Sequence, residues 1–242
     1  MKKSKNKQTK LLNTGLLALV LMVPGQNVLA GAKDDPLLTM VNIDQFEQRY
    51  GDEDPFVFEG QAWVGYDLEK VLLKAEGERV NGENESAELQ LLYSKAISPF
   101  WNIQLGARRD FKPEPSRNWG VIGFQGLAPY NIEIDTALFI GQSGSTSLRI
   151  EAEYELMLTQ RLVLRPEIEL NFFGKTDAKT QTGSGLANSE VGLRLAYEVR
   201  REFAPYIGVN WERKYGATAD FAQDNGESSS DTQFVIGFSA WF

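Results

Sequence analysis

Residues 147–158 read SLRIEAEYELML, and from Leu148 onward every second residue is apolar. The residues between them, from Arg149 to Glu155, are all charged. After a short connection the same pattern returns in residues 162–173, LVLRPEIELNFF. Strict alternation of this kind predicts two antiparallel β-strands, each with one apolar face and one charged face.

The alternation recurs in residues 191–199 and again in residues 231–242, DTQFVIGFSAWF. A soluble β-sandwich alternates in the same way, so strand length has to decide between the two classes. The predicted strands have about 10–13 residues, whereas soluble strands typically have about 5–6 and membrane-crossing strands need about 9–11. The sequence therefore predicts an all-β fold, a transmembrane antiparallel up-and-down β-barrel with its apolar face toward lipid.

Connections of unequal length predict the topology. Longer connections rich in Gly, Ser, Asn and Asp, which include residues 77–86, 110–118 and 216–230, alternate with tight turns. Bacterial barrels have short periplasmic turns and longer extracellular loops. With residues 40–50 as the first strand the prediction is twelve strands, an even number as closure requires, with ten as the alternative. Acidic residues of the outer loops are expected to be solvated, namely Asp110, Glu114, Asp220, Asp224 and Glu227.

The first thirty residues have the features of a Sec-type secretory signal peptide. Lysines precede a short apolar run at residues 16–23, and Val28-Leu29-Ala30 offers small residues for cleavage after Ala30. A membrane-spanning helix needs roughly 20 apolar residues, and this run is too short. We expect residues 1–30 to be a signal peptide, 31–37 a short periplasmic segment and 38–242 a barrel in the outer membrane.

The composition excludes several classes of function. Cleavage after Ala30 would leave 20 basic and 33 acidic residues, which argues against a nucleic-acid partner because phosphate binding requires a basic surface. The chain has no cysteine and no histidine. Without histidine neither a Ser-His-Asp triad nor a His-ligated zinc site can be built, and we expect no enzyme.

The charged faces of the predicted strands should line the barrel interior. Carboxylates paired across antiparallel strands lie close together and need cationic partners. Oxygen ligands would make this inner wall a weak metal site or a cation path, although a salt-bridge network that merely fills a narrow barrel is the simpler interpretation. The acidic candidates are Glu133, Asp135, Glu151, Glu153, Glu155, Glu167 and Glu169, joined by Glu88. The expected partners are Arg108, Arg149, Arg165 and Arg194.

Several segments resemble one known family. They are AELQLLYSKAISPFWNIQLGARRDF (87–111), EAEYELMLTQRLVLRPEIE (151–169), GLRLAYEVRREFAPYIGVNWERKYGATADFA (192–222) and FVIGFSAWF (234–242). Together they are similar to copper resistance protein B, an outer-membrane protein, over most of residues 63–242. The resemblance implies a role in copper tolerance, by binding copper ions or passing them across the outer membrane, with a periplasmic copper-binding protein as a candidate partner.

The chain departs from that family in its soft metal ligands. Members typically carry a Met- and His-rich stretch before the barrel, whereas Met40 and Met157 are the only methionines after Ala30 here. A Cu(I) site built from several His, Met or Cys ligands is therefore excluded, and copper held on carboxylates would be Cu(II), bound weakly. We include both methionines as candidate ligands, although each is more simply a packing residue, and expect Met157 on the inward face. The alternative function is a narrow general cation pore or a structural barrel without specific copper binding.

Overall fold

The computed structural model describes residues 35–242, so the predicted signal peptide and its cleavage after Ala30 lie outside the described residues. Most of the described chain is β-strand. The strands are β1 (Leu38–Tyr50), β2 (Phe56–Gly65), β3 (Glu69–Val80), β4 (Glu83–Ser98), β5 (Trp101–Lys112), β6 (Arg117–Ala128), β7 (Ile132–Gly141), β8 (Thr146–Tyr154), β9 (Leu156–Met157), β10 (Leu162–Phe173), β11 (Gly185–Tyr197), β12 (Phe203–Lys214) and β13 (Ser230–Trp241). Two 3-10 turns, η1 (Pro129–Asn131) and η2 (Gln142–Gly144), and one helix, α1 (Gly216–Asp224), complete the described part.

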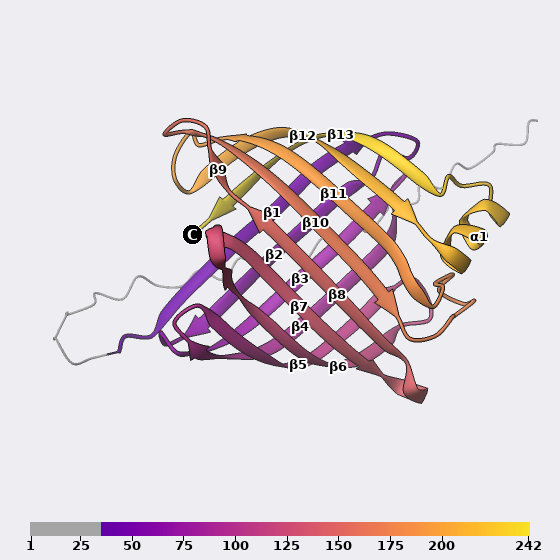
Figure 1. Ribbon diagram of the computed structural model, residues 1–242, viewed down its shortest axis with the longest axis horizontal. Coiled ribbons are helices and arrows are strands. Elements are labelled where there is room, and N and C mark those ends of the chain that lie inside the picture. The colour runs from indigo at the N-terminus through magenta and orange to yellow at the C-terminus, as the bar shows by residue number, and fades with distance from the viewer. Residues whose placement is uncertain (1–34) are drawn as a thin grey trace, which may run out of the picture. The chain divides into compact units, whose positions relative to one another are not determined.

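The sheet closes on itself. Each strand pairs antiparallel with its neighbours in sequence, and β13 returns to β1, with Phe238 opposite Phe46. The short β9 continues β8 after a break at Glu155, and both pair with β10. Counted as one, they make the described residues a closed barrel of twelve strands, which confirms the predicted fold class (Figure 1). Closure leaves no unpaired strand edge.

The outer surface is apolar, as the alternation predicts. On β4, Leu89, Leu91 and Tyr93 are 38–57% exposed, while the intervening Gln90 and Leu92 are 4% and 1% exposed. Directly paired residues on neighbouring strands point to the same side of the sheet, so each strand's inward residues follow from its partner's. A band of exposed apolar side chains around a closed barrel is suited to lipid.

The two ends of the barrel differ. The C-terminus lies at one, which we call the C-terminal end, and α1 lies at the other, which we call the loop end (Figure 1). The longest connections at the loop end are residues 174–184 and 215–229. No helix in residues 35–242 is long and apolar enough to cross a membrane.

Some predicted loops are wrong. Residues 77–86 do not form a long loop, because β3 and β4 continue to a two-residue turn at Asn81-Gly82, where φ is 50° and 87°. Positive φ at both positions is typical of the type I′ hairpin turn. Asp110 belongs to β5 and points inward instead of lying in a loop, and the segment with Asp220 and Asp224 forms α1.

The interior also holds apolar side chains, which the ionic pattern did not predict. Inward residues of β3, β4, β6 and β7 pack together and are 1–3% exposed; this apolar cluster consists of Leu72, Leu92, Val121 and Phe139. A second group at β11–β13, the C-terminal cluster, consists of Ala196, Ala204, Tyr206 and Val235. Two sides of the lumen are therefore filled by packed side chains.

Candidate functional site

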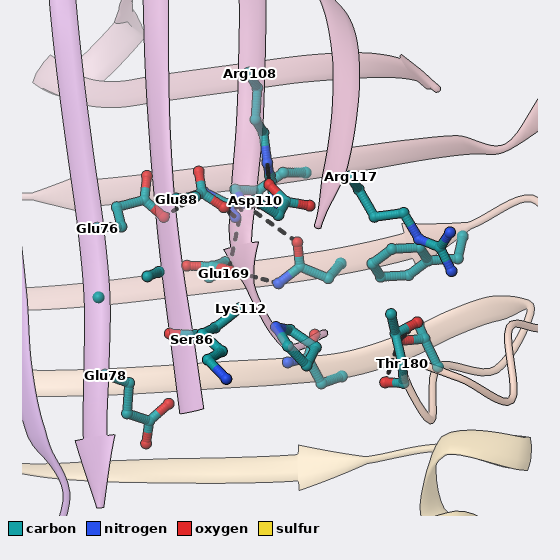
Figure 2. A pocket seen from close by; sticks show the side chains of 18 of the residues that line it. Glu76, Glu78, Ser86, Glu88, Arg108, Asp110, Lys112, Arg117, Glu169 and Thr180 are labelled. Atoms are coloured by element: carbon teal, nitrogen blue, oxygen red, sulfur yellow. Dashed lines mark hydrogen bonds and ion pairs between the residues drawn. The ribbon is translucent and has the colours of Figure 1, made fainter. Parts of the chain in front are cut away.

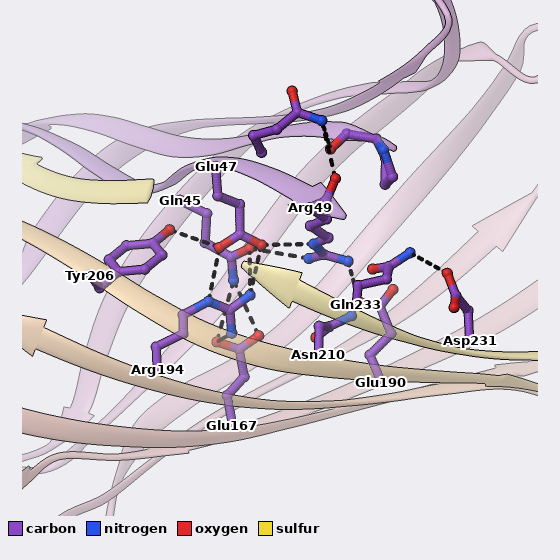
Figure 3. A network of polar contacts seen from close by, with 12 residues as sticks. Gln45, Glu47, Arg49, Glu167, Glu190, Arg194, Tyr206, Asn210, Asp231 and Gln233 are labelled. Carbon is purple, nitrogen blue, oxygen red and sulfur yellow. Dashed lines mark hydrogen bonds and ion pairs between the residues drawn. The ribbon is translucent and has the colours of Figure 1, made fainter. Parts of the chain in front are cut away.

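A buried ionic network crosses the lumen around Arg194, whose side chain is 4% exposed. The Arg194 Nε and Nη2 atoms donate to the two carboxylate oxygens of Glu47, each at 2.9 Å, and Nη1 donates to Glu167 at 2.9 Å (Figure 3). The Tyr206 hydroxyl donates to Glu47 at 2.8 Å. The network joins β1, β10, β11 and β12. Its hydrogen bonds compensate the buried charges of Arg194 and Glu47, each of which would be costly to bury alone.

Strand β1 supplies further members of this network. Arg49 donates to Glu47 at 2.7 Å and to Glu190 at 3.0 Å, and Gln45 donates to Glu167 at 3.1 Å. Strict alternation in the sequence does not predict these inward residues of β1. The pairing of β1 with β2 shifts its register between Ile43 and Gln45. This β-bulge changes whether the even-numbered or the odd-numbered residues of β1 face inward.

A second ionic network surrounds Arg149 on β8. Its Nη1 and Nη2 atoms lie 2.6 Å and 2.9 Å from carboxylate oxygens of Glu76 and Glu88 on the facing strands β3 and β4. Arg108 also pairs with Glu88, at 2.5 Å, and with Asp110, at 2.6 Å (Figure 2). The wall at β8 is thus bound to the wall at β3–β5 through the lumen.

The remaining predicted acids have weaker or different partners. Glu151 and Glu169 lie 3.8 Å and 3.7 Å from Arg149. Asp135 pairs with Lys74 at 2.5 Å, a partner not predicted from the sequence. Glu133 faces the lumen as the direct partner of Glu153.

Arg165 lies at the C-terminal end of the lumen. It lies 2.8 Å from Glu155 and 3.9 Å from Glu153, and it donates to the Ser239 hydroxyl at 3.0 Å. The four arginines expected inside the barrel therefore all face carboxylates there.

The two methionines are far apart in the sheet. Met40 is the direct partner of Trp63 and Met157 of Val163, and both partners face the interior, so the register places both methionines on the inward side. Met157, at the C-terminal end, is 56% exposed. They lie on β1 and β9, with β10 to β13 between them in the strand order. The register gives no reason to place them in one copper site.

A cavity of about 340 Å³ opens at the loop end, and side chains of both networks, among them Glu167 and Arg149, help to line it. Figure 2 shows part of its wall, including Glu76, Glu78 and Glu169. Nine acidic and six basic side chains line it, so its lining favours cations over anions. Arg117 and Asp177 form an ion pair at its rim. We call it the loop-end cavity.

Within residues 35–242 no group of three or more acidic side chains is arranged to hold a metal ion. Because carboxylate, amide and hydroxyl oxygens are the ligands available, the lumen suits hard or borderline cations better than Cu(I). The ligand role of the predicted residues stays a prediction.

A closed antiparallel barrel that is apolar outside and ionic inside defines the chain as an outer-membrane β-barrel protein. Two solved porins share the fold. The NanC porin superposes with a TM-score of 0.56 at 12% identity, covering 83% of this chain and 98% of that one. The KdgM porin superposes with a TM-score of 0.53 at 11% identity, covering 84% and 99%. At these identities the likeness concerns the fold alone.

Sequence comparison gives the family. The family model described as "Copper resistance protein B precursor (CopB)" matches residues 37–242. The chain is 44% identical over 210 residues to Copper resistance protein B of Escherichia coli, covering 86% of this chain and 71% of that protein. It is 47% identical over 180 residues to the Copper resistance protein B homolog of Pseudomonas syringae pv. tomato (strain ATCC BAA-871 / DC3000), covering 74% of this chain and 61% of that relative.

The chain therefore belongs to the copper resistance protein B family, which confirms the resemblance found in the sequence. It spans less than two thirds of the length of the Pseudomonas relative.

Proposed function

We propose that this protein contributes to copper resistance at the outer membrane, without catalysis, by binding copper ions or letting them pass through its lumen. The observation that carries the proposal is the family match, which extends over the whole barrel at residues 37–242. The loop-end cavity supports it, because a lining with more carboxylates than cationic groups attracts metal ions. The oxygen ligands favour Cu(II) over Cu(I).

The proposed orientation follows from the loops. Residues 174–184 and 215–229 would face the outside and the C-terminal end would face the periplasm, after export and cleavage near Ala30. Copper leaving the loop-end cavity inward would emerge near Arg165 and Glu155. A periplasmic copper-binding protein would meet the barrel at that end.

A general cation pore is the second candidate. The observation in its favour is that Met40 and Met157 are the only soft ligands in residues 31–242, a range without histidine or cysteine. A lumen of carboxylates alone distinguishes poorly among divalent cations. Such a barrel would carry magnesium as readily as copper.

Deletion of the gene, followed by growth with graded copper or magnesium, tests the two candidates. The copper proposal predicts a changed copper tolerance, restored by the full-length chain, with little change for magnesium. An unchanged copper tolerance would contradict it. Equal changes for both ions would favour the general pore.

A further inference from the structure

Six inward acidic residues form one continuous row on neighbouring strands. The direct pairs are Asp135 with Glu151, Glu151 with Glu169, Glu169 with Glu190, Glu190 with Glu212, and Glu212 with Asp231. We call this row the acidic ladder. Like charges directly opposite each other on paired strands are destabilising. Lys74, Arg149 and Arg49 compensate part of the row, through Asp135, through Glu151 and Glu169, and through Glu190.

The acidic ladder runs along the barrel from one end toward the other. Asp135 lies close to the start of β7, at the C-terminal end, and Asp231 lies at the start of β13, at the loop end. Barrel strands are tilted, so a row of direct partners climbs along the barrel axis as it passes from strand to strand. Its middle residues, Glu169 and Glu190, line the loop-end cavity.

The ladder also follows the accessible side of the lumen. The apolar cluster fills the lumen beside β3, β4, β6 and β7. The C-terminal cluster fills it beside β11–β13, toward the C-terminal end. Between them the ladder side chains stay in contact with water, with exposed fractions of 25% at Glu190 and 32% at Glu151. At the C-terminal mouth, Glu155 reaches 53%.

A second cavity, of about 320 Å³, lies at the loop-end terminus of the ladder and is lined by Glu212, Asp231 and Gln233. Two buried amide side chains, Asn210 and Gln233, contact acids of the ladder. Asn210, 0% exposed, donates to Glu190 at 3.3 Å, and Gln233, 4% exposed, donates to Asp231 at 3.1 Å (Figure 3).

The two amides are direct partners on β12 and β13, and neither amide oxygen has a hydrogen-bond partner among the described residues. Buried polar atoms are normally satisfied, so the unpaired oxygens require an explanation. Amide and carboxylate oxygens together are the ligands that hard divalent cations prefer.

We propose that the acidic ladder guides hydrated divalent cations through the barrel, from the two loop-end cavities to the mouth beside Glu153 and Glu155. Because no three acids converge on one point in residues 35–242, the ion passes stepwise between neighbouring carboxylates instead of resting in a chelating site. The proposal rests on the proposed function only for the identity of the physiological ion. The passage of oxygen-preferring cations is supported by the acidic ladder alone and does not depend on the copper function.

The test measures reversal potentials of the full-length folded protein in planar bilayers across a magnesium chloride gradient. The wild type should prefer magnesium over chloride. The double variant Glu151→Gln/Glu212→Gln should lower that permeability ratio about tenfold, since each substitution removes a fixed charge beside the ion.

Glu114→Gln is the control outside the lumen. Glu114 lies in the connection between β5 and β6, its side chain is 77% exposed, and it lines neither loop-end cavity. The control should change the ratio less than about twofold, because a solvated surface charge is screened. Heat-dependent gel mobility verifies that each variant is folded.

Two results would overturn the proposal: a folded wild type that passes no cations, or a control that loses as much selectivity as the double variant. Growth on copper separates this outcome from the proposed function. If deletion changes copper tolerance but the double variant restores it fully, the ladder is not the copper route. If selectivity depends on the ladder while deletion leaves copper tolerance unchanged, the copper function fails and the ladder stands.

Discussion

Arg194 on β11 and Glu47 on β1 form a two-pronged ion pair, although β12 and β13 lie between them in the sheet. Both donor–acceptor distances are 2.9 Å, and the side chains are 4% and 0% exposed. The pair links β11 to β1 across the contact between β13 and β1, where the last strand meets the first. It therefore stabilises the barrel where the sheet closes.

Glu47→Gln should destabilise the folded barrel. The substitution removes the carboxylate that Arg194, Arg49 and Tyr206 all contact, and leaves buried cationic groups undercompensated. We expect the free energy of unfolding in urea to fall by about 3 kcal/mol. The control Glu155→Gln breaks an ion pair whose carboxylate is 53% exposed and should change it by less than about 1 kcal/mol. Equal effects of both substitutions would contradict the role of the buried network.

Gly237→Ala should disturb the same network by crowding. A Cβ atom at Gly237 would lie 2.6 Å from the Glu47 Cβ and 2.9 Å from the Tyr206 ring, so both neighbours must move. The expected loss in the free energy of unfolding is about 1–3 kcal/mol. Gly120→Ala is the control, because the nearest atom to its new Cβ would be the Ile140 carbonyl oxygen at 3.8 Å. A larger loss at Gly120 than at Gly237 would refute this explanation.

Copper titration of the purified protein should distinguish the two oxidation states. We expect weak binding of Cu(II) and none of Cu(I), because oxygen ligands predominate. The triple variant Glu151→Gln/Glu153→Gln/Glu155→Gln should weaken Cu(II) binding, whereas Met40→Leu/Met157→Leu should leave it unchanged. Identical Cu(II) isotherms for the wild type and the triple variant would remove these carboxylates from the candidate site.

The fold could be predicted from sequence because every second residue of a membrane-crossing strand faces lipid. Each strand has one face toward hydrocarbon, and the residues at that face, such as Leu89 and Leu91 on β4, are constrained to be apolar whatever their partners. The turn at Asn81-Gly82 could have been predicted as well, since this dipeptide is a strong hairpin signal between alternating strands.

The lumen was less predictable. The β-bulge near Asp44 shifts the inward parity of β1, and a strict period of two cannot reveal such a shift. The partners of Arg149, Glu76 and Glu88, lie more than sixty residues away in sequence, so only the closed barrel brings them together. The apolar cluster escaped detection because both faces are apolar at residues 71–73 and 91–93.

The most direct test of the account measures the environment of consecutive residues on one strand. The chain has no cysteine, so single cysteines at positions 88–93 of β4 can each carry a spin label in the lipid-reconstituted protein. The closed membrane barrel predicts that labels at Leu89, Leu91 and Tyr93 collide with oxygen dissolved in lipid, while those at Glu88, Gln90 and Leu92 do not. Labels that fail to alternate, or that contact water on both faces, would contradict a barrel with its apolar face in lipid and its charges enclosed.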